Sequence, residues 1–532
     1  MNADKQPWFR GAVVYQIYPR SFKDSNNDGV GDLPGIIAKL DYLAGKPDSL
    51  GVTAIWLSPF YPSPMVDFGY DISDYQGVDP VFGTIEDFKR LIDEAHSRNL
   101  KVIIDFVPNH TSDQHPWFVE SKSSRDNPKH DWYVWKDPGP DDSYPNNWLS
   151  ALGGPAWEFD RTRQQFYLHS FLKEQPDLNW DNPEVRAAMM DNVRFWLNLG
   201  ADGLRVDAVL YISKDPELRD DPPNPNPAGS AYTSLLHKRS RSGPNLFKYL
   251  DELSKTVKNY GNRVMITEAY FDVQGNLNNY LDFYYNLDSS VCAPFNFEGI
   301  LMDWDATQFQ SHIDSYQSIL LDSFVPIYCL GNHDQPRLAS RIGRPAAKVA
   351  GTMLLTLPGI PFIYYGDELG MVDVPVSPEN VRDPQEKNEP GIGLGRDPER
   401  SPMQWSGEAN AGFSHVDPWL PVAQDFSSAN ADALGKDENS IFNLYRKLLT
   451  LRNASPTLRY GIYGSLNLGE GVFAYTRSLE NQTILVLLNF TNNLLQLSQA
   501  QKIKKILVST TAINQGTVIT ELQPNEAIVA EI

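Results

Sequence analysis

Residues 84–107 read TIEDFKRLIDEAHSRNLKVIIDFV, and this stretch decides the fold class of the chain. Its first part predicts an amphipathic helix over Thr84–Leu100, which Thr84 can cap. The apolar face of that helix is formed by Ile85, Phe88, Leu91, Ile92 and Ala95. Val102–Val107 then follows as a nearly continuous apolar run, the pattern of a strand buried on both faces. A helix joined at once to such a strand is the repeating unit of a parallel α/β fold.

The same kind of apolar run recurs along the chain. A second predicted helix, Asn182–Gly200, has Asn182 as its cap, Pro183 at its first position and Gly200 at its end. Repeated strand and helix units of this length predict an α/β fold built on a (β/α)8 TIM barrel rather than an open sheet. The other strand-like runs are Val13–Tyr18, Val52–Leu57, Leu204–Val209, Val264–Thr267, Phe324–Leu330 and Pro361–Tyr365.

Two regions depart from the barrel pattern. Residues 105–174 are rich in Trp, Pro, Asp and Asn, and they predict a lobe inserted after the third strand. Residues 456–532 contain short strands separated by turns and predict a C-terminal antiparallel β-domain. The barrel itself is then expected over residues 1–104 and 175–455. Two polar, Pro-rich stretches, 211–245 and 371–402, are too long for ordinary loops and predict functional walls around a site.

The composition limits the partners and the compartment. The chain has 532 residues, 41% of them hydrophobic, and a net charge of −21, so it is a globular protein that would repel nucleic acid and anionic membranes. Its two cysteines do not form a disulfide framework, which favours a reducing compartment. Neither an apolar signal segment nor a run of eighteen apolar residues occurs. A cytoplasmic enzyme without a membrane partner is therefore expected.

Polar side chains close the predicted strands, and the strand ends of a (β/α)8 barrel meet at one face. Clustered carboxylates at such a face suit either a metal-dependent hydrolase or a glycosidase. The H-x-H spacing that is common in the first class is absent, but residue types alone leave both classes open. The residues concerned are Asp105, Asn109, His110, Arg205, Asp207, Glu268, Asn332, His333 and Asp334.

The spacing of Arg205 and Asp207 suggests a role for the second residue. Side chains two residues apart on a strand point the same way, so the Arg205 cation is expected to keep Asp207 ionised, as a nucleophile requires. Glu268 would then act as the acid, and His333 and Asp334 could bind sugar hydroxyl groups.

Seven segments resemble the signature regions of the α-amylase superfamily, glycoside hydrolase family 13, which contains retaining glycoside hydrolases and transglycosylases. They occur in the order of that family and extend over nearly the whole chain. The resemblance implies a catalytic barrel, a lobe after strand three and a C-terminal β-domain. The segments are GVTAIWLSPF at 51–60, DFVPNH at 105–110, QPDLNW at 175–180, GLRVDAV at 203–209, ITEAY at 266–270, GNHDQPR at 331–337 and GIPFIYYGDELG at 359–370.

The resemblance also implies roles for individual residues. Asp207 corresponds to the nucleophile, Glu268 to the acid/base, and Asp334 to a third carboxylate that binds hydroxyl groups and helps distort the ring. QPDLN is similar to the version found in the oligo-1,6-glucosidase and α-glucosidase branch, which acts on the non-reducing end of small sugars. Ligands of the glucosyl unit would be His110, Arg205 and His333.

In that branch, the residue matching Asp67 pairs with an arginine and closes the site beyond the terminal glucose. The residue matching Tyr70 forms an aromatic platform for the sugar ring. The partner arginine is expected within GRDPERSPMQW, residues 395–405, and we choose Arg400 over Arg396. Phe297 is expected to line the aglycone site.

The bond that is cleaved is predicted from residue 208. Members of the branch that prefer α-1,6 bonds tend to carry Val after the nucleophile, whereas this chain has Ala208, which favours α-1,4 or sucrose-like α-1,2 bonds. The 211–245 loop resembles that of bacterial α-glucosidases that act on short substrates and transfer glucosyl groups. We therefore expect a retaining, exo-acting α-glucosidase for maltose-like disaccharides, with transglucosylation. The alternative is an oligo-1,6-glucosidase or a glucosyltransferase or sucrose-processing enzyme on the same scaffold.

A separate motif predicts a structural cation. Residues 24–32 read DSNNDGVGD and place oxygen ligands at alternate positions, as in the first part of an EF-hand, although Gly35 stands where the closing Glu would be. The motif resembles the single Ca²⁺ or Mg²⁺ loop of this branch. A metal-free turn held by Asx hydrogen bonds is the alternative. The expected ligands are Asp24, Asn26, Asp28, the carbonyl of Val30 and Asp32. No organic cofactor is expected, and the chain is expected to be a monomer or a weak homodimer.

Overall fold

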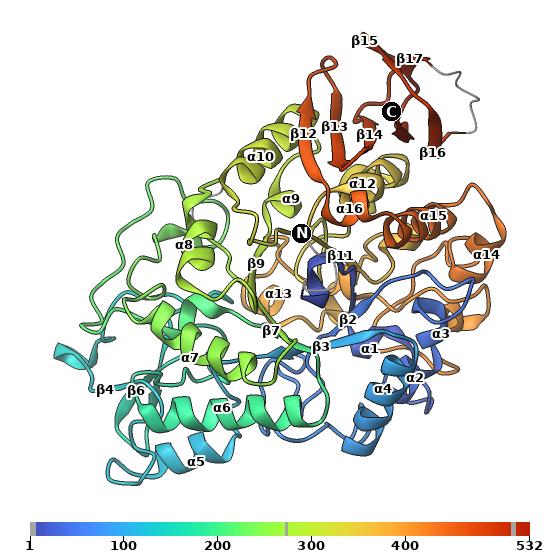
Figure 1. Cartoon of the computed structure of the whole chain (residues 1–532). Helices are drawn as coiled ribbons and strands as arrows, with labels where there is room; N and C mark the ends of the chain where they lie inside the picture. The colour runs from blue at the N-terminus through green and yellow to red at the C-terminus, as the bar shows by residue number, and fades with distance from the viewer. Residues whose placement is uncertain (1–6, 272–274, 512–517) are drawn as a thin grey trace.

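A closed barrel of eight parallel strands forms the centre of the computed structural model, which describes residues 7–271, 275–511 and 518–532 (Figure 1). The strand order around the barrel is β1-β11-β10-β9-β8-β7-β3-β2. The predicted (β/α)8 fold class is thus confirmed. The strands are β1 Val14–Ile17, β2 Ala54–Leu57, β3 Lys101–Phe106, β7 Gly203–Val206, β8 Val264–Thr267, β9 Cys292–Asn296, β10 Ile327–Cys329 and β11 Ile360–Tyr364.

Seven of these strands coincide with the predicted apolar runs, with two differences. The sixth barrel strand, β9, was not among the predicted runs, because its five residues include Pro294 and end in a polar Asn296. The fourth strand ends at Val206, earlier than expected, because Ala208 adopts a left-handed backbone with φ of 45°. That turn leads directly into a short 3-10 helix, η4, at Val209–Ile212.

The two predicted helix caps are confirmed. Thr84 and Asp87 form a capping box at the start of α4, Ile85–Ser97, and the Asn182 side chain accepts a hydrogen bond at the start of α6, Pro183–Asn198. The other helices are α1 Pro19–Phe22, α2 Leu33–Ala38, α3 Leu40–Leu43, α5 Pro116–Ser123, α7 Leu246–Lys258, α8 Asn278–Asn286, α9 Glu298–Leu301, α10 Ala306–Ile319, α11 Leu338–Ile342, α12 Arg344–Thr356, α13 Pro384–Asn388, α14 Ala431–Lys436, α15 Ile441–Ala454 and α16 Pro456–Tyr460.

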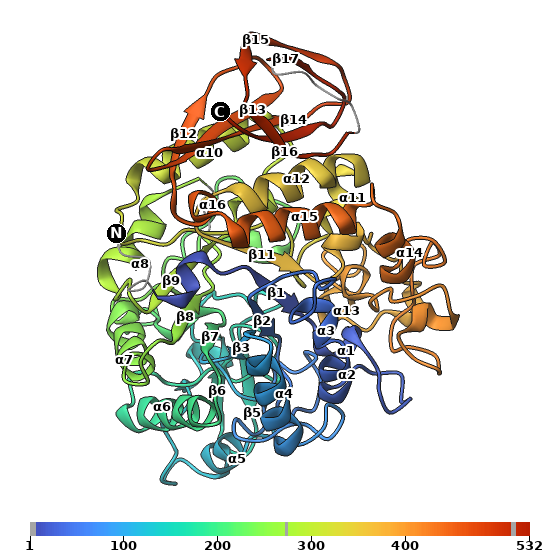
Figure 2. The ribbon, with the colours of Figure 1, turned by 45° about the vertical axis from the view of Figure 1, so that its right-hand side comes forward.

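The inserted lobe and the C-terminal β-domain lie at different ends of the molecule (Figure 1). The lobe contains α5 and a small antiparallel sheet in the order β4-β6-β5. The C-terminal domain has a five-stranded sheet, β12-β13-β14-β18-β16, that packs on α10, α12 and α16 (Figure 2). These strands are β4 Trp135–Lys136, β5 Trp157–Asp160, β6 Gln165–Leu168, β12 Ile462–Leu466, β13 Val472–Leu479, β14 Gln482–Asn489, β16 Lys505–Ser509 and β18 Ala527–Glu531, with β15 Leu495–Lys502 paired to β17 Val518–Leu522.

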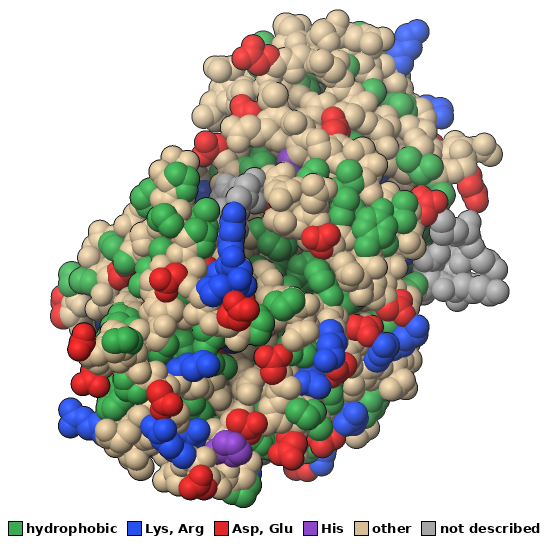
Figure 3. Space-filling model, turned by 90° about the vertical axis from the view of Figure 1, so that its left-hand side faces the viewer, with side chains coloured by type: hydrophobic (Ala, Val, Ile, Leu, Met, Phe, Trp, Pro, Cys, Tyr) green, Lys and Arg blue, Asp and Glu red, His purple; other side chains and the backbone are tan. Residues whose placement is uncertain are grey.

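The surface agrees with the composition. On the face drawn in Figure 3, acidic and basic side chains are interspersed and no continuous basic surface is seen. Within the described residues, no helix combines the length and the apolar character needed to cross a membrane. Cys292 and Cys329 are both buried free thiols.

Two buried arginines converge on the end of α12, and one of them, Arg477, joins the C-terminal domain to the barrel. Arg452 of α15 donates to the carbonyl oxygens of Leu355 and Leu357 (both 2.9 Å), and Arg477 of β13 donates to that of Thr356 (2.6 Å). These carbonyls belong to the end of α12, where helical carbonyls lack partners and the helix dipole is negative. Both guanidinium groups are fully buried, and burial lowers the pKa of Arg452 to about 9 and that of Arg477 to about 10.

We predict that Arg477→Met lowers the free energy of unfolding by about 2–4 kcal/mol, because charged hydrogen bonds at the end of α12 are lost and the carbonyls stay buried. Chemical unfolding followed by circular dichroism measures this change. Arg161→Met, at an exposed position, is the control. Equal stabilities of the two variants would show that the arginine contact contributes nothing.

Candidate active site

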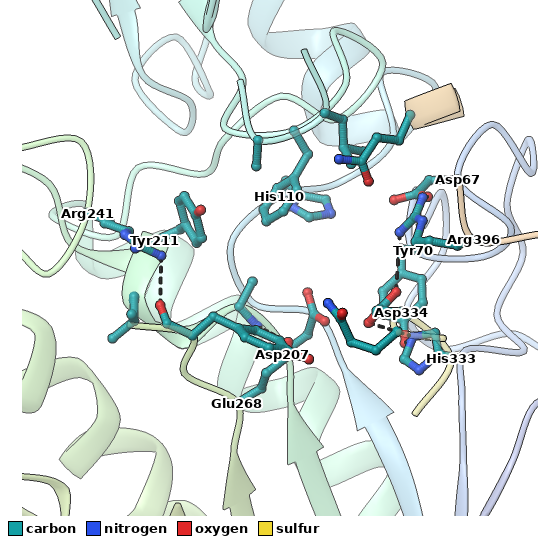
Figure 4. A pocket seen from close by; sticks show the side chains of 18 residues that line it. Asp67, Tyr70, His110, Asp207, Tyr211, Arg241, Glu268, His333, Asp334 and Arg396 are labelled. Atoms are coloured by element: carbon teal, nitrogen blue, oxygen red, sulfur yellow. Dashed lines mark hydrogen bonds and ion pairs between the residues drawn. The ribbon is translucent and has the colours of Figure 1, made fainter. Parts of the chain in front are cut away.

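A cavity of about 240 Å³ opens at the carboxyl ends of the barrel strands (Figure 4). The inserted lobe, the 211–245 loop and the 371–402 loop contribute its walls. Seven of the residues singled out from the sequence line it, which places residues far apart in the chain around one small space. They are Asp67, Tyr70, His110, Asp207, Glu268, His333 and Asp334.

Arg205, in β7, lies beneath the cavity floor and holds two of its carboxyl groups. Its Nη1 donates to Asp207 Oδ1 (2.6 Å) and to Asp105 Oδ1 (2.8 Å), and its Nη2 pairs with Glu268 Oε1. Since one guanidinium holds both Asp207 and Glu268, the two carboxyls must lie close together. Close spacing of two carboxyls is what a retaining glycosidase needs, whereas an inverting one needs room for a water molecule.

The charge balance of this cluster differs from the expectation. Burial raises the pKa of Asp207 well above its usual range, and the negative charge of Glu268 adds to this rise against the lowering effect of Arg205. Burial likewise raises the pKa of Asp105 to about 6, although Arg205 lowers it. One cation shared by three carboxyls is too little to keep all of them ionised in a buried site. Contrary to the expectation from the sequence, the Arg205 cation therefore does not by itself hold the pKa of Asp207 down.

The backbone of Ala208 helps to position Glu268. Ala208 has φ of 45° and ψ of 40°, a left-handed conformation that costs energy for any residue with a Cβ. In this conformation its N–H donates to Glu268 Oε2 (3.0 Å). The turn after β7 therefore holds the acid/base candidate from one side while Arg205 holds it from the other.

The partner of Asp67 is Arg396, so the choice of Arg400 was wrong. Arg396 Nη2 lies 2.9 Å from Asp67 Oδ1 and 2.7 Å from Asp383 Oδ1. Arg400 instead turns inward, where its Nε donates to the carbonyl of His333 (2.8 Å). Gln175, from the QPDLN motif, donates to Asp67 Oδ2 (3.1 Å) and completes this end of the cavity.

Asp334 lies between the two arginines, 3.0 Å from Arg400 Nη2 and 3.4 Å from Arg396 Nη1. Burial would raise the pKa of Asp334, but the positive charges around it hold that pKa below its usual range. An ionised Asp334 can accept hydrogen bonds from hydroxyl groups in the cavity.

The two histidines of the cavity are neutral ligands. Burial lowers the pKa of His110 to about 4 and that of His333 to about 3. The Gln16 amide (2.8 Å) and the Tyr70 hydroxyl (2.6 Å) contact the two ring nitrogens of His333. The Tyr70 ring also stacks on the His333 ring, at 5.5 Å and 3°. A neutral imidazole has one N–H donor and one acceptor nitrogen, and both nitrogens of each ring already have protein partners. A ligand hydroxyl group can therefore bind to either ring only by replacing one of these contacts.

Phe297 does not lie where it was expected. It is buried behind the cavity wall and stacks on Tyr270 at 4.3 Å and 7°, so Tyr270 is the ring that faces the cavity. Sequence reasoning missed several lining residues, although the length of the two loops pointed to the segments that carry some of them. The missed residues are Ala151, Leu152, Phe171, Leu210, Tyr211, Arg241, Tyr270, Gln335 and Gln385.

An ammonium group fixes the base of the inserted lobe. Lys214 Nζ donates to Asn109 Oδ1 (3.0 Å) and pairs with Asp177 Oδ2 (2.7 Å). Asn109 follows β3, Asp177 ends the lobe, and Lys214 lies in the loop after β7. This buried contact therefore joins three segments that surround the cavity.

The predicted cation loop is closed by its own hydrogen bonds. Asp24 accepts from the N–H groups of Asn26 (3.0 Å) and Asn27 (2.7 Å), and Asp28 accepts from that of Val30 (2.9 Å). Asp32 caps α2 through Gly35 N–H. In the part of the chain that the structure describes, no three His, Cys, Asp or Glu side chains converge as a metal site. The hard oxygen donors suit Ca²⁺ or Mg²⁺, but cation binding stays a prediction.

Comparison with known proteins agrees with this geometry. The family model described as "Alpha amylase, catalytic domain" matches residues 16–461. The oligo-1,6-glucosidase of Parageobacillus thermoglucosidasius is 39% identical over 99% of both chains, and Maltase 1 of Drosophila virilis is 42% identical over 92% of this chain and 79% of its own.

Solved structures of similar proteins extend over the whole chain. A crystal structure of an alpha-glucosyl transfer enzyme matches with a TM-score of 0.91 at 37% identity, covering 99% of this chain and 100% of that one. The trehalulose synthase of Pseudomonas mesoacidophila MX-45 matches with a TM-score of 0.88 at 37% identity over 99% of both chains.

Fold and site together define a glycoside hydrolase that works at the mouth of a (β/α)8 barrel. The family model matches most of the chain, and relatives near 40% identity extend over almost all of it. The chain therefore belongs to the alpha-amylase family, close to proteins named oligo-1,6-glucosidase and alpha-glucosidase.

We predict that Arg396→Gln lowers kcat/KM by about 10- to 100-fold, because Asp67 and Asp383 lose their shared charged partner. Steady-state kinetics with p-nitrophenyl α-glucoside measures the effect, together with inhibition by glucose. Arg382→Gln, an exposed position in the same loop, is the matched control. A small effect in Arg396→Gln, equal to that of the control, would contradict the assignment of Arg396.

Proposed function

We propose that this enzyme is a retaining, exo-acting α-glucosidase that releases glucose from the non-reducing end of short α-glucosides. One observation carries the proposal: the Asp67–Arg396 ion pair lies at the end of the cavity opposite Arg241 (Figure 4), where we propose that it closes the site. A site closed beyond one sugar ring accepts a chain end and excludes the interior of a polymer. The volume of about 240 Å³ is consistent with a small substrate.

The proposed reaction has two displacement steps. Asp207 attacks C1 of the terminal glucose while Glu268 gives its proton to the glycosidic oxygen, so that a glucosyl–Asp207 ester forms and the aglycone leaves. Water then attacks C1 as Glu268 takes its proton, and Asp207 leaves as a carboxylate. Asp334, His110 and His333 bind the hydroxyl groups of the glucosyl unit.

For the bond, we propose a preference for α-1,4 over α-1,6 linkages, with sucrose as a further substrate. Ala208 lines the cavity beside Glu268, and its small side chain leaves room for the aglycone. We further propose transfer of the glucosyl group to acceptors other than water, in a cytoplasmic enzyme that acts on small sugars.

The second candidate function is isomerisation of sucrose, which the similarity to a trehalulose synthase favours. Isomerisation would require the released fructose to stay bound and re-attack the same intermediate. The resemblance to this branch implies that its sucrose isomerases carry an arginine-rich segment after the sixth strand. The corresponding segment here, APFNFEGILMDWD at residues 293–305, contains no arginine. Transfer to a second sugar is therefore the better supported reaction.

Substrate profiling with Ala208→Val tests the proposed linkage. We expect the wild type to cleave maltose faster than isomaltose, and the variant to raise the isomaltose-to-maltose rate ratio at least about fivefold, since a branched side chain narrows the aglycone site. Products from maltose, isomaltose, sucrose and trehalose are resolved over time by chromatography.

Two controls accompany the profile. Ala208→Gly keeps the aglycone space open and suits the left-handed backbone position, so its isomaltose-to-maltose ratio should stay close to that of the wild type. Asp207→Ala should lose activity by about 10⁴-fold or more with an unchanged circular dichroism spectrum. If the wild type cleaves isomaltose faster than maltose, the proposed α-1,4 preference is wrong. If Asp207→Ala turns over substrate at the wild-type rate, Asp207 is not the nucleophile.

We also propose that the loop formed by residues 24–32 binds Ca²⁺ or Mg²⁺. Its oxygen atoms at alternate positions support this, and bound cation at 100 times its Kd would add about 2.7 kcal/mol to stability. We expect millimolar CaCl₂ or MgCl₂ to raise the melting temperature of chelator-treated enzyme, and Asp28→Ala to abolish the rise. Asp48→Ala, at an exposed position, should keep it. The same melting temperature with and without either cation would contradict cation binding and favour a metal-free turn held by Asx hydrogen bonds.

A further inference from the structure

A second cavity, of about 490 Å³, is formed by the 371–402 loop together with Pro336. It shares no lining residue with the active-site cavity. Most of its wall is apolar, and this part of the wall can cover a hydrocarbon group without losing hydrogen bonds. The apolar residues are five prolines and two valines, Pro336, Pro375, Val376, Pro378, Val381, Pro390 and Pro398.

Four carboxyl groups and one ammonium group make up the polar part of the wall. Among the described residues, none of the four carboxyls forms an ion pair. Three of them accept hydrogen bonds from backbone N–H groups of the same loop or of the residues beside it. The cavity is therefore acidic and lacks cationic partners. The carboxyls belong to Asp373, Glu386, Asp397 and Glu399, and the ammonium group belongs to Lys387.

Glu399 is the carboxyl that lacks such a partner. It is 3% exposed, and no other residue in the described part of the chain donates a hydrogen bond to its carboxyl group. Its backbone carbonyl accepts from the Tyr364 hydroxyl (3.1 Å), which fixes the short helix η8, Pro398–Arg400, at the cavity wall. One oxygen of Asp397, Oδ1, is also buried without a hydrogen-bond partner.

The surroundings of Glu399 disfavour its negative charge. Burial raises the pKa of Glu399 to about 8, although the positive charge of Arg400 lowers it. The negative charges of Asp373 and Asp334 add to the rise. A buried carboxylate without a cation costs free energy, so a positive charge placed in this cavity would be stabilised.

The wall suits an organic cation better than a metal ion. Ca²⁺ and Mg²⁺ need about six oxygen ligands, and the described residues hold no group of three His, Cys, Asp or Glu side chains that could bind a metal. A primary ammonium group instead needs only a few acceptors and forms strong hydrogen bonds with a carboxylate. Its hydrocarbon part would be buried on the prolines and valines, which is favourable in water.

We propose that this cavity binds a small primary amine as its ammonium ion, with the ammonium group at Glu399 and the hydrocarbon part on the proline and valine wall. Glu399 directly precedes Arg400, which contacts Asp334, and the same loop carries Arg396, which contacts Asp67. A bound amine thus stabilises the loop that forms one side of the active site. This inference does not depend on the proposed glucosidase reaction.

Calorimetric titration with n-butylammonium chloride, at constant pH and ionic strength, tests the proposal. We expect the wild type to bind n-butylammonium at least about tenfold more tightly than the neutral 1-butanol, since only the cation forms a charged hydrogen bond. Glu399→Gln should weaken n-butylammonium binding about tenfold or more and leave 1-butanol binding unchanged. Glu379→Gln, an exposed position in the same loop, is the matched control and should bind like the wild type.

Three results would overturn the proposal. The first is a wild type that does not bind n-butylammonium, and the second is equal affinity for n-butylammonium and 1-butanol. The third is equal n-butylammonium affinity in the wild type and Glu399→Gln, which would place the amine elsewhere, for example among the active-site carboxyls. Thermal melting checks the fold of each variant, and Glu399→Leu gives the same comparison if Glu399→Gln does not fold. A lack of glucosidase activity would contradict the proposed function and leave the amine site untouched.

Discussion

The buried guanidinium of Arg205 is the contact on which the rest of the site depends. Adjacent parallel strands β3, β7 and β8 bring Asp105, Asp207 and Glu268 to this one cation. In a buried site each unpaired carboxylate is costly, so one cation shared by three carboxyls leaves the pKa of Asp207 raised. The barrel register, which pairs Asp105 with Arg205 directly, therefore brings the three carboxyls to one cation.

A second arginine, Arg396, likewise contacts three carboxyl groups at the other end of the cavity, but it lies on a loop. Arg396 contacts Asp67, Asp383 and Asp334, and it reaches them from the 371–402 loop rather than from a strand. Under the proposed function, chemistry and substrate length would be determined by different parts of the chain. The proposed reacting groups lie at strand ends, whereas the residues proposed to close the cavity lie on loops. Loops tolerate change better than barrel strands, which fits a family whose similar members carry names as different as maltase, glucosyl transfer enzyme and trehalulose synthase.

The sequence predicted best what depends on strands. Buried parallel strands leave a continuous apolar pattern, and the polar residues that end them must meet at one face, so the barrel and most of the cavity floor could be predicted. Strand β9 was not predicted, because the strand is short and contains Pro294, which interrupts the apolar pattern. Arg400 was chosen over Arg396 because two arginines four residues apart look alike in sequence. Only the path of the short helix at Pro398–Arg400 buries Arg400 and turns it toward His333. The prediction for Phe297 was wrong for a similar reason. The sequence does not show which of the two stacked rings, Tyr270 or Phe297, faces the cavity.

Ala208 contributes to the site through both its backbone and its side chain. Its left-handed backbone directs an N–H group at Glu268, and its side chain borders the aglycone space. A larger side chain at this position changes the shape of the aglycone space and, through strain in a backbone conformation that branched residues avoid, the orientation of the N–H group that holds the acid. Under the proposed reaction, the linkage preference would therefore depend on the orientation of Glu268 as well as on the available space, because an α-1,4 and an α-1,6 bond present the leaving oxygen from different directions.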